Sequence, residues 1–119
     1  MRPQDAKMTP SAPHGFLRVG AACPPVAVAD PGRNAEQTVA FARRAGERGV
    51  QVLVLPELGL TGYTCGDLFF SLSTLVAGAE RALERILRET VSLPMVIVVG
   101  PVVETDVRRE TSGSTPAVW

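Results

Sequence analysis

The chain has 119 residues, a formal net charge of zero and interspersed acidic and basic side chains, which suits one domain with a single core. Neither a nucleic-acid surface nor a polybasic membrane contact is indicated, and no apolar run approaches the length of a membrane span. We expect a cytoplasmic protein with reduced thiols whose ligands are small molecules.

The first 14 residues include three prolines and few apolar side chains, so we expect a flexible leader. A strand is predicted over Phe16–Cys23, because this short apolar run stops at two consecutive prolines that cannot continue a strand ladder. A helix is predicted to begin after Asp30 and to stop at Gly49, where glycine tolerates a left-handed backbone. The apolar face of this helix consists of Ala35, Val39, Ala42 and Ala45.

The run Val50–Leu55 is apolar on both faces except for Gln51, as expected of a parallel strand covered on both sides by helices. Pro56 and the glycines that follow it predict a loop, in which the backbone can approach a ligand. These glycines are Gly59, Gly62 and Gly66.

Asp67 is predicted to cap a short helical turn through Phe70, and a longer amphipathic helix follows. Its apolar stripe is Leu75, Val76, Ala79, Leu83, Ile86 and Leu87, and its charged face, which we expect to be solvated, carries the pairs Glu84–Arg88 and Arg85–Glu89. Met95–Gly100 is predicted to be a third buried strand. The predicted fold class is therefore α/β, a β-α-β-α-β segment with parallel strands over residues 15–103, and residues 104–119 are expected to be disordered.

The string LPELGLTGY, from Leu55 to Tyr63, resembles the first catalytic signature of the nitrilase superfamily of carbon-nitrogen hydrolases. Within that superfamily the segments HGFLRVGAAC, LPELGLTGYTCGDLF and LPMVIVVG are most similar to the glutaminase domain of bacterial glutamine-dependent NAD synthetases. The resemblance implies part of a nitrilase-type α-β-β-α sandwich that hydrolyses glutamine or another small amide. It also implies that the parent enzyme is a homo-oligomer that uses ATP and Mg through a domain absent from this chain, which itself would hold no cofactor.

The resemblance implies a Glu-Lys-Cys triad in which Glu57 is the general base toward the thiol and later toward water. Tyr63 would lie near the substrate pocket or pack without a functional role. The family Lys and Cys follow the Glu, whereas the only lysine here is Lys7 in the leader. Cys23 is expected to be a small buried residue, and Cys65 matches a variable position of the family.

The remaining polar candidates give no metal site, because two distant cysteines and the single His14 do not form a zinc set. Gly62 is expected to serve backbone conformation. The change from family-like to aperiodic sequence after Val103 predicts a truncated chain that is inactive alone. Two alternatives remain, namely a non-catalytic binding or regulatory module and a piece of another nitrilase-family amidase.

Overall fold

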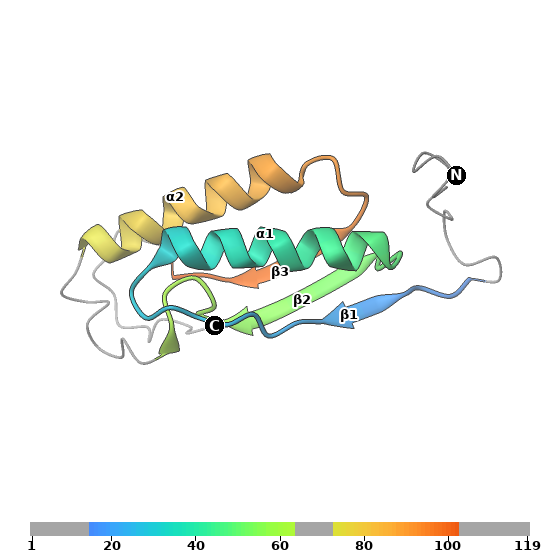
Figure 1. Ribbon diagram of the computed structural model, residues 1–119, viewed down its shortest axis with the longest axis horizontal. Coiled ribbons are helices and arrows are strands. Elements are labelled where there is room, and N and C mark those ends of the chain that lie inside the picture. The colour runs from blue at the N-terminus through green and yellow to red at the C-terminus, as the bar shows by residue number, and fades with distance from the viewer. Residues whose placement is uncertain (1–14, 64–72, 103–119) are drawn as a thin grey trace, which may run out of the picture.

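The computed structural model describes residues 15–63 and 73–102, which form a three-stranded parallel sheet with two helices (Figure 1). The elements run β1 (Val19–Ala21), α1 (Pro31–Glu47), β2 (Val52–Glu57), α2 (Ser73–Thr90) and β3 (Val96–Gly100). The spatial order is β1-β2-β3, and both neighbouring pairs are parallel. The predicted α/β class and β-α-β-α-β order are confirmed.

The first helix has the boundaries that its local chemistry dictates. Asp30 is the N-cap and its Oδ1 accepts a hydrogen bond from the Arg33 amide at 3.1 Å, while Pro31 occupies the first helical position. Gly49 follows the helix with a φ of +71°, which confirms the predicted left-handed end. The predicted strand before this helix is shorter than expected, because only three of its residues pair with β2.

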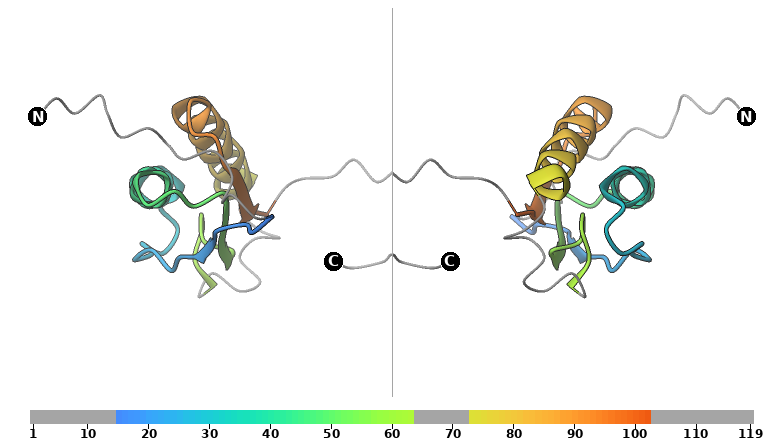
Figure 2. Two further views of the ribbon diagram at one scale, coloured as in Figure 1. Left: turned by 90° about the vertical axis from the view of Figure 1, so that its right-hand side faces the viewer. Right: turned by 90° about the vertical axis from the view of Figure 1, so that its left-hand side faces the viewer.

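Both helices cover the same face of the sheet (Figures 1 and 2). Leu53 and Leu55 of the central strand are buried on this face, and Leu53 is only 2% exposed. The helices pack on each other through small and branched side chains, with one leucine from the loop after β2 joining them. This cluster consists of Ala35, Val39, Leu60, Ala82 and Ile86, with Leu83 at its margin.

The opposite face of the sheet carries apolar side chains that no described residue covers. We call it the valine face and define it by Val19 (65% exposed), Val54 (44%), Val96 (60%) and Val98 (46%). In the strand register Val54 lies opposite Val98. Val52 lies opposite both Val19 of β1 and Val96 of β3. The prediction that helices cover β2 on both sides is therefore wrong, because both helices lie on one face.

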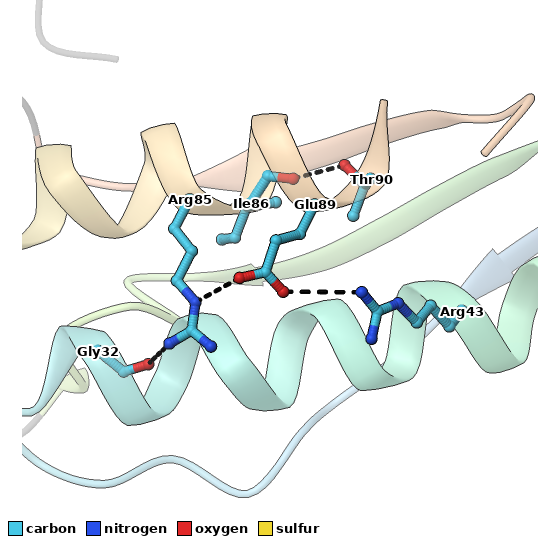
Figure 3. Close-up of polar contacts among 6 residues, drawn as sticks. All are labelled: Gly32, Arg43, Arg85, Ile86, Glu89 and Thr90. Carbon is cyan, nitrogen blue, oxygen red and sulfur yellow. Dashed lines mark hydrogen bonds and ion pairs between the residues drawn. The ribbon is translucent and has the colours of Figure 1, made fainter. Parts of the chain in front are cut away.

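The second helix contributes a charged contact between the helices (Figure 3). The Arg85 Nε donates to Glu89 Oε1 at 2.7 Å, and Arg43 of α1 approaches the other carboxylate oxygen at 3.7 Å. The hydrogen bond from Arg85 holds the pKa of Glu89 below its ordinary value of 4.5, and the nearby positive charges add to this. The predicted pair is thus part of a bridge to α1 and not only a solvated surface contact.

The apolar stripe of α2 differs from the prediction at two positions. Leu87 is exposed, whereas Ala82 is buried against α1. Ala82 lies three residues after Ala79 and therefore on the same side of the helix, which faces α1. Its small side chain permits close packing of the two helices. Among the described residues, neither helix is long and apolar enough to cross a membrane.

Candidate active site

Glu57 is the last residue of the central strand, at the carboxyl end of the parallel sheet. Pro56 does not end β2 as predicted, since the strand includes it and continues for one more residue. The register between β2 and β3 shifts between Val54 and Glu57, so that Glu57 lies opposite Gly100. The missing proline N–H is tolerated at such an irregularity, where the regular hydrogen-bond ladder is already interrupted. The Glu57 side chain is exposed.

The chain turns sharply immediately after Glu57. Leu58 has a φ of +54°, a left-handed conformation that is uncommon for a leucine, and its amide donates to the Gly100 carbonyl at 2.7 Å. The Leu58 carbonyl in turn accepts a hydrogen bond from the Gly62 amide at 2.8 Å. Gly62 has a φ of +88°, which confirms its predicted backbone role.

A buried asparagine attaches this turn to the helix layer. Asn34, in the first part of α1, is 2% exposed. Its Nδ2 donates to the carbonyls of Leu60 at 2.9 Å and Ala27 at 2.7 Å, and its Oδ1 accepts from the Ala27 amide at 2.7 Å. One side chain therefore connects the segment before α1, the helix itself and the turn after Glu57.

Asn34 was missed by the sequence reasoning, although the sequence contains a signal for it. It directly precedes Ala35 on the apolar side of the predicted helix, where an asparagine is a poor helix former. A polar residue at such a position is buried only if its hydrogen bonds are satisfied. The helical pattern could thus have indicated a structural contact, but not its partners.

The other predicted site residues do not gather around Glu57 in the described part of the chain. Tyr63 follows the turn and is 70% exposed. Cys23 is exposed, which contradicts its predicted buried role, because the backbone beyond β1 leaves the sheet before reaching it. Lys7, His14, Cys65, the predicted helical turn from Asp67 to Phe70 and the tail after Val103 lie outside the described residues. Within residues 15–63 and 73–102, no three His, Cys, Asp or Glu side chains form a metal-binding group.

The arrangement is suited to proton transfer at the edge of the sheet. Ligands of open parallel sheets bind outside the carboxyl ends of the strands, which is where Glu57 stands. A carboxylate that projects from a strand end and is followed by a tightly bonded turn has a fixed backbone and an accessible head group. The described residues thus offer one proton acceptor at this edge, without a nucleophile beside it.

Comparison with known proteins gives a family match over most of the chain. The profile of the carbon-nitrogen hydrolase family matches residues 18–115. The glutamine-dependent NAD(+) synthetases of Mycobacterium tuberculosis (strain ATCC 25618 / H37Rv) and Mycobacterium bovis are each 36% identical to this chain over 87 residues. That of Mycobacterium leprae (strain TN) is 32% identical over 87 residues. Each match covers 73% of this chain but only 13% of the relative.

Proposed function

The chain belongs to the carbon-nitrogen hydrolase family, and we propose that it contributes the general base Glu57 to a glutamine-hydrolysing amidase domain. In the parent enzyme the released ammonia would be used in the ATP-dependent conversion of deamido-NAD to NAD. The observation that carries this proposal is the position of Glu57, which ends the central strand at the carboxyl edge of the sheet within the family match.

The proposed mechanism uses Glu57 for proton transfer in two steps. In the first, its carboxylate accepts the proton of a cysteine thiol as the thiolate attacks the amide carbon of glutamine. It then passes this proton to the amide nitrogen, so that ammonia leaves and a thioester forms. In the second, it accepts a proton from the water that hydrolyses the thioester and returns that proton to the cysteine sulfur. The family resemblance assigns the nucleophile to a Cys and the stabilisation of the oxyanion to a Lys, both of which follow the Glu in sequence.

Within the 119 residues, neither partner has a candidate. The only lysine is Lys7, which precedes Glu57, and Cys23 also precedes it, on an exposed segment before α1. Cys65 is the one cysteine after Glu57, and it matches a variable position of the family instead of the nucleophile. We therefore propose that a polypeptide of these 119 residues does not hydrolyse glutamine by itself. ATP and Mg would be bound by another domain of the parent enzyme, and no cofactor is assigned to this chain.

A chimera tests the assignment of Glu57. The matching 87 residues of the Mycobacterium tuberculosis synthetase are replaced by those of this chain, and NAD formation is measured with glutamine and, separately, with ammonia. We expect both activities in the chimera, and we expect Glu57→Gln to abolish only the glutamine-dependent one. Retention of glutamine-dependent synthesis in that variant would exclude Glu57 as the base.

The valine face supports a second candidate, a non-catalytic module that binds a partner through its sheet. Under the amidase proposal this face is where the second sheet of an α-β-β-α sandwich packs, since two sheets stack through alternating apolar residues. Under the module proposal the isolated chain is a cooperatively folded monomer that recruits another protein. Size-exclusion chromatography over a range of protein concentrations, with thermal unfolding, separates the two, because a broken sandwich self-associates as its concentration rises whereas a module stays monomeric.

A further inference from the structure

Gly100 lies closer to Glu57 than most side-chain-bearing residues could. A Cβ built on Gly100 would stand 3.1 Å from the Glu57 Cα and 3.8 Å from both its Cβ and its Cγ. The first of these distances is below ordinary van der Waals contact, and its partner is a backbone atom that cannot rotate away. Any residue other than glycine at position 100 must therefore change the spacing between the Gly100 and Glu57 backbones by a few tenths of an ångström.

The two residues are also joined through the backbone. Gly100 is the register partner of Glu57, and its carbonyl accepts the Leu58 amide at 2.7 Å. This hydrogen bond holds Leu58 in its left-handed conformation, φ +54°, directly after the glutamate. Strain of this kind persists only where surrounding contacts fix it, and here the end of β3 supplies one of those contacts.

We propose that Gly100 is a positioning residue for Glu57: its missing side chain lets β3 approach the glutamate, and its carbonyl fixes the turn that follows. The proposal rests on the proposed function, because the position of Glu57 matters only if its carboxylate transfers protons. A base displaced by a fraction of an ångström loses its alignment with the thiol. The role of Gly100 is thus to fix the backbone position from which the Glu57 side chain extends.

The test compares two glycines on the edge strands of the same sheet. Gly100→Ala introduces the 3.1 Å contact with a backbone atom, whereas Gly20→Ala in β1 meets only side-chain atoms, of Val50 at 3.4 and 3.5 Å and of Leu53 at 3.7 Å. Isotopically labelled chains are compared by nuclear magnetic resonance, using residual dipolar couplings of the Cα–Hα bonds and the three-bond couplings that report the Glu57 χ1 rotamer. Unfolding is followed by circular dichroism in parallel.

In Gly100→Ala we expect altered couplings at Glu57 and Leu58, with Val52 to Leu55 unchanged, and about tenfold faster amide exchange of Leu58 because its hydrogen bond is weakened. In Gly20→Ala we expect these couplings and the Leu58 exchange to match the wild type. A folded Gly100→Ala chain whose Glu57 couplings equal those of the wild type overturns the proposal. So does a change that spreads evenly through the sheet in both variants, since that is the signature of a merely structural glycine.

If Gly100→Ala does not fold, amide exchange of the wild-type chain provides the test instead. Protection of the Leu58 amide from exchange supports the proposal in that case, and exchange at the unprotected rate overturns it. None of these readouts needs turnover. Failure of the chimera assay would therefore remove the role of Glu57 as base, whereas unmoved Glu57 couplings would remove only the role of Gly100.

Discussion

Replacement of Asn34 by alanine is expected to destabilise the protein and to release the turn after Glu57. The variant loses three hydrogen bonds, two to Ala27 and one to the Leu60 carbonyl. At about 0.5–1.5 kcal/mol net for each bond, the loss is about 3 kcal/mol. The better helix propensity of alanine returns roughly 0.5 kcal/mol, which leaves about 2.5 kcal/mol.

This loss is a large part of the stability of a small domain, about 5–15 kcal/mol in total. Urea unfolding followed by circular dichroism measures it directly, and the midpoint of thermal unfolding is expected to fall by roughly 10 °C. Amide exchange adds a local readout, because the Ala27 amide donates to the Asn34 side chain and should lose its protection. Gln37→Ala on the same helix is the matched control, with an expected change of less than about 0.5 kcal/mol.

A small effect would refute the reasoning. If Asn34→Ala unfolds within about 0.5 kcal/mol of the wild type, the three bonds do not hold the segments together. Unchanged exchange of the Ala27 amide would point the same way. Equal losses in Asn34→Ala and Gln37→Ala would assign the effect to the helix as a whole instead of to the bonds of one side chain.

Four further substitutions test other parts of the structure. Glu89→Gln should reduce the loss of stability at acid pH. Because the pKa of Glu89 is lowered in the folded state, its carboxylate contributes stability that is present above pH 4.5 and is lost as the pH falls through the folded-state pKa. Urea unfolding between pH 7 and pH 3 measures this loss. Gly62→Ala should cost about 1–2 kcal/mol in thermal unfolding, because a φ of +88° strains an L side chain. In urea unfolding, Leu53→Ala should lower the stability by about 2–5 kcal/mol, because Leu53 is buried under the helices. Val54→Ala should lower it by less than about 1.5 kcal/mol, because Val54 lies on the uncovered valine face.

Each of these substitutions has a control or a contrary outcome. For Glu89→Gln, a loss of stability at acid pH equal to that of the wild type would contradict the contribution assigned to the Glu89 carboxylate. Gly32→Ala, in the first turn of α1, places a Cβ no closer than 3.8 Å to another atom and should change stability by less than about 0.5 kcal/mol. Equal costs at Leu53 and Val54 would contradict the assignment of covered and uncovered faces.

The sequence predicted the elements of this fold where one local rule dominates. The first helix begins after Asp30 and ends before Gly49 as predicted, since capping and the left-handed glycine are properties of single residues. The prediction for β2 was wrong at Pro56, because only the partner strand reveals that the ladder shifts there. The expected burial of both faces of β2 was also wrong, since an apolar run does not say how many layers pack on it.

For the candidate site, the sequence identified the residue and the approximate place, but not its supports. Glu57 was predicted to lie two residues beyond the end of the central strand at Leu55, whereas in the structure the strand extends to Glu57 itself. The left-handed Leu58 carries no compositional signal, because leucine rarely adopts that conformation. The contact with Gly100 depends on the register of two strands more than 40 residues apart in sequence, which no local pattern encodes.

The one-sided placement of the helices has a consequence for access to Glu57. The glutamate is the last residue of the central strand, at the carboxyl edge of the sheet. A layer that packs on the valine face would extend beside the carboxyl ends of the strands. The open edge of the sheet at Glu57 would then become one side of a cleft. Packing on the valine face would thereby control how much water reaches the Glu57 carboxylate, without contacting that side chain.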